Sequence, residues 1–323
     1  MNKANGSPVK GFSHVRVIAS LQALFVTVLW SSSWVIIKFG LAEIPPLIFA
    51  GLRYTIASII LLAIIGTKKT SRKAIKGRSK KWWGSLLVYG SIFIAATQGT
   101  QFLALDYLPA ITLSLLLNMT PAIVLILAIP LLKETPSPME FFFILISIIG
   151  VLVYFYPLDF VGVSIFGLII GLASLLFNSI SAILGRAINR LKDTPAIIVT
   201  GISMSVGSCL LLLIGFSTEN YTPLSLVSWF YILWLAIINT ALAFTLWNGA
   251  MQELRAIDTT LINSTMMPQI VLLSIVFLGE FPDLLGWIGL ILLAIGITAV
   301  QILQTKRKES KRTIKGDQKT PEP

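Results

Sequence analysis

The sequence predicts an all-α integral membrane protein with ten transmembrane helices, arranged as two inverted five-helix repeats. Three observations predict it: long apolar runs, lysine and arginine gathered on one side, and an internal repeat. The chain has 323 residues, of which 55% are hydrophobic and 12% charged, whereas an ordinary soluble domain carries about 25% charged residues. We therefore expect lipid to surround most of the chain.

Ten apolar segments approach or exceed the length of about 20 residues that a helix needs to cross a bilayer. Hydrocarbon offers no partner to backbone amides, so these continuous runs are expected to be helices. The first run is longer than the apolar region of a secretory signal, which spans about 7 to 15 residues, so it is expected to be retained. The segments are 17–37, 46–66, 82–105, 109–132, 141–158, 160–185, 195–217, 224–249, 256–278 and 284–303.

Ten crossings distribute the basic residues very unevenly between the two sides. One side receives 23 of the 25 lysines and arginines, which leaves Lys38 and Arg53 for the other. The positive-inside rule makes the basic side cytoplasmic. This predicts a multi-pass protein of the cell membrane with both termini in the cytoplasm. The net charge of +11 is then a topology signal rather than a sign of nucleic-acid binding, and the basic loops suit contact with membrane lipid.

A single shift of the sequence along itself brings similar residues of the two halves onto one another, and we call this alignment the repeat register. Because five helices are an odd number, the second copy enters the membrane from the opposite side, which is a transporter architecture. Chance alignment of apolar sequences is the alternative. The predicted division is a cytoplasmic tail at 1–17, a first repeat at 18–158, a second repeat at 159–303 and a basic cytoplasmic tail at 304–323. The matching pairs are Ala104 with Ala250, Ala110 with Ala256, Glu134 with Glu280 and Gly150 with Gly296.

Short motifs in this order carry a family resemblance. The first half has 29–33 (LWSSS), 49–54 (FAGLRY) and the turn at 104–110, and the second half has 250–256, Pro268 and 279–280. With them, the chain resembles the drug/metabolite transporter superfamily in its ten-helix form with two EamA-type domains, over residues 18–303. The resemblance implies carriage of small metabolites, often export of amino acids or other organic compounds. Ser31 departs from it, since the family often has glycine there, and this bears on local packing.

Two prolines, Pro121 and Pro268, lie about twelve residues into their helices. Each removes a backbone hydrogen bond, which frees the carbonyls of Leu117 and Ser264. Proline interruptions at corresponding places in two halves point to a binding site and to a gating role. A kink that serves packing alone is the alternative.

Polar and aromatic side chains at helix centres form the candidate substrate-binding set. Each amide could bond a solute or equally a neighbouring helix, an interaction worth about 0.6 kcal/mol. Polar neighbours, including Thr120, Thr240, Ser264 and Gln269, accompany them. The candidates are Trp30, Ser33, Trp34, Arg53, Gln98, Gln101, Asn118, Asn178, Asn239, Trp247, Asn248 and Asn263.

Arg53 is the most informative charge, because an arginine inside the membrane is by default a functional hypothesis. Together with Lys38 it could hold a carboxylate or phosphate of the solute. Alternatively, Lys38 extends to the interface and Arg53 binds helix-end carbonyls or Glu43. Glu134 and Glu280, at matching helix ends, are expected to form a structural pair, each capping or bridging to the adjoining helix start.

These features predict a secondary transporter that moves a small polar metabolite, an amino acid or a related organic solute, by alternating access, with export as the expected direction. No phosphate-binding loop of the GxxxxGK[ST] type is present, which disfavours primary transport. A membrane-embedded enzyme acting on lipid or small metabolites is the alternative, although such chemistry usually needs clustered histidines, acids or metal ligands. With a single histidine and a single cysteine, we expect no enzyme activity, no cofactor and no metal. A monomer suffices, and a homodimer is compatible.

Overall fold

The computed structural model describes residues 14–132, 136–156, 164–189, 194–221, 223–254 and 256–317. Every regular element in these ranges is a helix, as the apolar runs predict. The elements are α1 (His14–Leu41), α2 (Pro46–Thr67), α3 (Lys69–Ile75), α4 (Lys80–Gly90), η1 (Ser91–Ala96), α5 (Thr97–Tyr107), α6 (Ala110–Asn118), α7 (Thr120–Leu132), α8 (Pro138–Tyr154), α9 (Ile165–Asn189), α10 (Ala196–Thr218), α11 (Leu226–Ala236), η2 (Ile237–Leu242), α12 (Ala243–Glu253), α13 (Ala256–Ser264), α14 (Met266–Leu278) and α15 (Leu284–Asp317).

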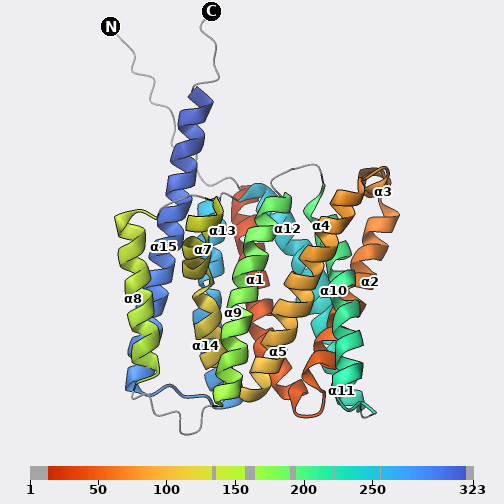
Figure 1. Ribbon diagram of the computed structural model, residues 1–323, viewed down its shortest axis with the longest axis horizontal. Helices are drawn as coiled ribbons and strands as arrows, with labels where there is room; N and C mark the ends of the chain where they lie inside the picture. Colours follow the sequence, from red (N-terminus) through yellow and green to blue (C-terminus); the bar gives the residue numbers. More distant parts are fainter. Residues whose placement is uncertain are drawn as a thin grey trace, which may run out of the picture.

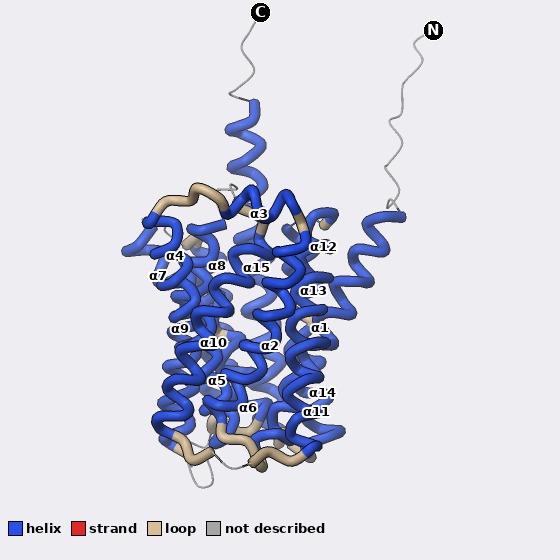
Figure 2. Tube along the Cα trace, turned by 90° about the vertical axis from the view of Figure 1, so that its right-hand side faces the viewer, coloured by secondary structure: helices blue, strands red, loops and turns tan. Residues whose placement is uncertain are grey.

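The helices match the ten predicted crossings. Within the described residues, nine helical stretches are long and apolar enough to span a membrane, and α8 is a shorter apolar helix of 17 residues. Some spans consist of several consecutive elements: α4, η1 and α5 form the third, α6 and α7 the fourth, α11, η2 and α12 the eighth, and α13 and α14 the ninth. The beginning of α1 and the end of α15 lie on the same face of the bundle (Figures 1 and 2). We call this face the terminal face and the other the opposite face.

Several helices begin at residues suited to that position. Pro45 precedes α2 and Pro195 precedes α10 with nearly equal backbone angles, φ −56° and −55°. Ser137 and Glu140 form a reciprocal capping box at the start of α8, which satisfies two backbone donors that the first turn leaves free. Ser79 and Ser225 cap α4 and α11 in the simpler way, by accepting one backbone hydrogen bond. Prolines thus precede two of these helices, and capping serines precede the other three.

The two halves repeat in detail in the predicted repeat register. The alignment that places Ala110 on Ala256 also places the π-helical segment η1 (Ser91–Ala96) on η2 (Ile237–Leu242), end for end. It likewise places α6 on α13 and α7 on α14, with the same first and last positions. Because each half contributes five crossings, the second half is inverted with respect to the first. The fold is therefore two inverted five-helix repeats, as predicted.

The repeats exchange helices rather than standing side by side. Helix α1 of the first half packs against α12, α13 and α14 of the second, whereas α9 of the second half packs against α5, α6 and α7 of the first. The α8–α15 pair forms one end of the bundle, and α2, α10 and α11 form the other (Figure 1). The central helices between these ends carry most of the candidate residues.

The outside of the bundle is apolar and its two faces differ in charge. Large side chains such as Phe142, Ile169 and Leu272 are more than half exposed, as expected for a surface that faces lipid. On the terminal face, the linker between α2 and α4 and the first two residues of α4 together carry eight lysines and arginines. By contrast, the described loops and helix ends of the opposite face carry acids: Glu43, Asp106, Glu219, Glu280 and Asp283.

Candidate functional site

The fourth and ninth spans are both interrupted near their middle. One break lies at Met119, between α6 and α7, and the other at Thr265, between α13 and α14. These two residues fall on one another in the repeat register, so the break itself obeys the repeat even though the prolines are one position out of register. Thr120 Oγ1 donates to the carbonyl of Leu117 at 2.6 Å, which is one of the two carbonyls that the sequence predicts to be free. A neighbouring hydroxyl therefore supplies a hydrogen bond to the carbonyl that the break leaves free.

The two breaks meet at a small polar pocket. Asn118 beside one break and Asn263 beside the other both line it, together with Ser264 and Gln301. Its volume is about 20 Å³, which is room for about one water molecule. The structure thus brings two of the predicted asparagines together, at a space too small for an organic solute.

A second polar cluster lies where α2 meets the π-helical segment η2 and the start of α5. Arg53 Nε donates to Thr240 Oγ1 of η2 at 3.0 Å, and Tyr54 donates to Gln98 Oε1 at 2.7 Å, just after η1. The Arg53 guanidinium lies over the rings of Tyr54 and Phe102, 5.0 Å and 5.9 Å from their centroids. π-Helical turns inside α-helices are frequent at functional sites. The alternative pairing of Arg53 with Glu43 is not observed, because Glu43 accepts hydrogen bonds from Ser225 and Ser228.

A hydrogen-bonded network joins α1 to the ninth span. Gln269 donates to Thr27 and Thr265 at 3.2 Å and 3.0 Å, and it accepts from Ser31 at 3.0 Å. Ser31 is fully buried, so the serine that departs from the family pattern contributes a hydroxyl to this network.

In the eighth span, Asn239 donates to the carbonyl of Leu29 and to Ser32, and its carbonyl oxygen is sealed without a partner in the described part of the chain.

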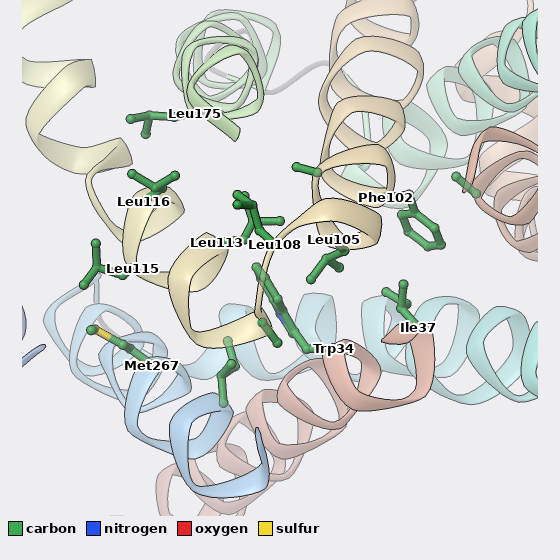
Figure 3. Packing of buried hydrophobic residues seen from close by; sticks show 14 of the residues in the cluster. Trp34, Ile37, Phe102, Leu105, Leu108, Leu113, Leu115, Leu116, Leu175 and Met267 are labelled. Atoms are coloured by element: carbon green, nitrogen blue, oxygen red, sulfur yellow. The ribbon is translucent and has the colours of Figure 1, made fainter. Parts of the chain in front are cut away.

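Trp30 and Trp34, one turn apart on α1, have different surroundings. The Trp30 ring packs against Phe244 and Trp247 of α12, with centroids 5.5 Å and 5.1 Å away, and it is partly exposed. Trp34 is buried in the main apolar core beside Leu105 and Leu108 (Figure 3). Trp30 and Trp247 therefore suit a pocket wall, whereas Trp34 is a packing residue.

The remaining candidates are scattered. Asn178 donates to Thr120 at 3.3 Å, which ties the sixth span to the break in the fourth, and Ser33 donates to the carbonyl of its own helix at Trp30. Gln101 and Asn248 are partly exposed, and their side chains make no hydrogen bond with the described part of the chain. Across the described residues, no three histidine, cysteine or acidic side chains come together as a possible metal site.

Boundary acids cap helices across the bundle. Glu280 accepts from the backbone amides of Ala110 and Ile111 at 2.8 Å and 2.9 Å, so it caps α6 of the other half. The expectation that it caps the adjoining helix start is wrong, because packing brings the start of α6 closer to it than chain order suggests. Its predicted counterpart Glu134 lies outside the described residues.

Glu219 and Glu43 illustrate different environments for a carboxylate on the opposite face. Glu219 caps α2 by accepting from Leu47 and Ile48, yet burial raises its pKa above the ordinary value. At Glu43, hydrogen bonds from Ser228 and Ser225 lower the pKa of the carboxyl. Desolvation dominates in the first case and direct hydrogen bonding in the second.

Sequence reasoning missed the π-helical segments and the partners that they place. Thr240 and Gln269 were noted only as polar neighbours of other candidates, and Tyr54 only as part of a motif. The repeat register was the one available signal, since it aligns the two segments. The residue types at 91–96 and 237–242 do not by themselves predict a π-helical turn.

Comparison with known proteins places these features in a family. A profile of the EamA-like transporter family matches residues 17–156 and again residues 165–301. The chain is 27% identical over 305 residues to the uncharacterized transporter YvbV of Bacillus subtilis (strain 168), a match that covers 92% of this chain and 95% of that protein. It is also 24% identical over 241 residues to a probable amino-acid metabolite efflux pump of Salmonella typhimurium (strain LT2), covering 70% of this chain and 76% of the pump.

One solved structure, titled only as the crystal structure of a protein, shares the fold. The TM-score is 0.62 at 19% identity, and the match covers 90% of this chain and 99% of that one. At this identity the likeness concerns architecture alone.

Proposed function

The chain belongs to the EamA-like transporter family, and from that premise we propose that it is a secondary carrier that exports a small polar organic solute, such as an amino acid or a related metabolite. The transport would proceed by alternating access of the two inverted repeats. Its relatives include a probable amino-acid metabolite efflux pump, which supports this solute class. The basic terminal face supports a cytoplasmic position for both termini in the cell membrane.

The observation that carries the proposal is the pairing of interruptions. Both halves have a π-helical segment and a mid-span break at positions that coincide in the repeat register. Interrupted helices at corresponding places in inverted repeats point to a substrate site between them. Polar groups gather at these places, among them the buried Arg53 and Asn239 and the partly buried Gln269. Regular helices would have a lower free-energy cost in lipid, since every backbone group is hydrogen-bonded within the helix.

We assign the solute site to the central helices that the repeats exchange. Trp30 and Trp247 would form an aromatic wall, and Gln98 and Asn178 would supply amides. The breaks at Met119 and Thr265 would be the hinges, with Pro121 and Pro268 limiting the backbone bonds that resist bending.

Efflux from liposomes tests the proposal. The purified protein is reconstituted into vesicles loaded in turn with each radiolabelled L-amino acid, and efflux is followed without nucleotide. We expect saturable efflux and acceleration by unlabelled solute on the other side for at least one amino acid. Linear, unsaturable efflux, or no efflux of any amino acid from protein with a cooperative thermal transition, would contradict the proposal.

Two tryptophan variants provide the matched comparison. Trp30→Ala removes a ring that contacts Phe244 and Trp247, and we expect efflux to fall about tenfold, the equivalent of one aromatic contact of about 1.5 kcal/mol. Trp83→Ala removes an exposed ring near the terminal face and should leave efflux unchanged. Equal losses in both variants would argue against a pocket at Trp30.

A further inference from the structure

Arg53 is a cation held deep in the membrane-spanning part of the bundle. It lies seven residues inside α2 (Pro46–Thr67), about 10 Å from the start of that helix at 1.5 Å per residue. Only 5% of its surface is exposed. Such a charge is costly to bury, and a purely structural arginine would be expected to have an acidic partner.

The described part of the chain supplies no such partner. Arg53 makes one hydrogen bond, from Nε to Thr240, and no carboxylate of these residues forms an ion pair with it. A guanidinium has five N–H donors, so four remain without an acceptor among the described residues. The sealed side-chain atoms that lack partners belong to Thr55, Ser203, Asn239 and Ser274. No nitrogen of Arg53 is among them, so its terminal nitrogens are not completely sealed.

The described acids of the opposite face form no ion pair with Arg53, and the three glutamates among them are engaged elsewhere. Glu43 accepts from two serines, Glu219 caps α2 and Glu280 caps α6. None of them is therefore a counter-charge for Arg53 in this structure. The missing anion must come from outside the described chain.

The surroundings of Arg53 present further donors and a rigid frame. Gln98 accepts from Tyr54 through its oxygen, which leaves its amide hydrogens unused by the described chain. The rings of Tyr54 and Phe102 hold the guanidinium from the side. Two terminal N–H groups of one guanidinium match the two oxygens of a carboxylate, and this bidentate pairing is stronger than a neutral hydrogen bond.

We infer that Arg53 binds a carboxylate of the transported solute, with Gln98 as an additional donor, so that the carrier selects carboxylate-bearing solutes over their neutral analogues. This inference rests on the proposed function. Thr240 and the two rings position the guanidinium, and the solute supplies the negative charge that the described residues do not provide. Solute and site would then neutralise each other during the crossing.

Paired probes test this directly. The amino acid that the wild-type protein exports best is compared with its amide, which has nearly the same shape and no carboxylate, as competitors of labelled efflux. We expect the wild-type protein to prefer the acid by about 10- to 100-fold, as for a hydrogen bond to a charged group. Arg53→Gln should bring this ratio close to one while changing the affinity for the amide less than about threefold. Arg53→Lys should give an intermediate ratio, because it keeps the charge and loses the fork.

Lys81→Gln is the control, since Lys81 is an exposed basic residue at the start of α4 on the terminal face; its acid-to-amide ratio should equal that of the wild type. A structural role for Arg53 predicts instead that Arg53→Gln weakens acid and amide equally, which would overturn the inference. Efflux of a solute that has no carboxylate would also overturn it and leave the carrier function standing. If the wild type moves nothing, the proposed function itself fails.

Chemical modification keeps the test valid should Arg53→Gln not fold. Phenylglyoxal reacts with accessible arginines, and mass spectrometry reports the modification of Arg53 in the wild-type protein. The amino acid should protect Arg53 and the amide should not. If the acid and the amide protect Arg53 equally, carboxylate binding at this residue is contradicted. The same holds if neither compound protects Arg53 although efflux proceeds.

Discussion

The α8–α15 pair and the central helices have similarly apolar sequences but different structures. The pair consists of continuous, closely packed helices, whereas the central helices are interrupted. In the pair, Gly150 and Gly289 let the two backbones touch, because a Cβ on Gly150 would lie 2.8 Å from the carbonyl oxygen of Gly289. Both helices are continuous. The central spans instead contain breaks, π-helical segments and buried polar groups, such as Asn239 and Thr240. The comparison suggests that one region holds the fold rigid and the other is built to change shape.

The difference shows how a membrane protein separates stability from function. Small residues give close packing where no movement is needed. Interrupted helices lose regular backbone bonds and regain them through side chains, as Thr120 does at Leu117, and such side-chain bonds can be exchanged during a conformational change. Three variants test whether this division holds.

The largest effect is expected at the rigid pair. Gly150→Leu would place side-chain atoms within 2.7 Å of the Leu293 backbone nitrogen, and overpacking of this kind costs about 3 kcal/mol of unfolding free energy. We expect a clear fall in the thermal midpoint in detergent and loss of folded protein. Gly66→Leu is the control, since nothing lies within 4 Å of a Cβ there. A stable Gly150→Leu protein with altered solute selectivity would break the comparison.

An intermediate effect is expected in the α1–α14 network. Gln269→Leu removes three hydrogen bonds that join Thr27, Ser31 and Thr265. At about 0.6 kcal/mol each, the loss of stability should be about 2 kcal/mol, and efflux should fall by more than the stability change explains. Measuring the thermal midpoint and the efflux rate of the same preparation separates the two. Unchanged efflux would show that this network stabilises the fold and takes no part in transport.

The smallest effect is expected at Glu43, which links the loop after α1 to the start of α11 through Ser225 and Ser228. These bonds lower the carboxyl pKa below its ordinary value of 4.5. The stabilisation is therefore present above pH 4.5 and disappears as the pH falls through the folded pKa. The thermal midpoint of the wild type should drop slightly more in acid than that of Glu43→Gln. Parallel curves for the two proteins would show that the link adds nothing.

Much of the candidate site could be named from the sequence, but its grouping could not. The intramembrane position of Arg53, the paired prolines and the amides at helix centres follow from the sequence, because a polar group in a long apolar run is conspicuous. Their partners do not follow. Trp30 and Trp34 look equivalent by spacing, yet one lines an aromatic cluster and the other lies in the core.

By itself, the sequence determined the number of spans, the helical fold, the inverted repeat and the transporter class. Those features depend on each run meeting lipid separately, so local composition is enough to determine them. Tertiary structure alone decided that Glu280 caps α6 rather than the next helix, that Arg53 on α2 meets Thr240 in the other half of the chain, and that two spans widen into π-helical turns. These depend on which helices pack together, and packing between distant segments leaves no local pattern in the chain.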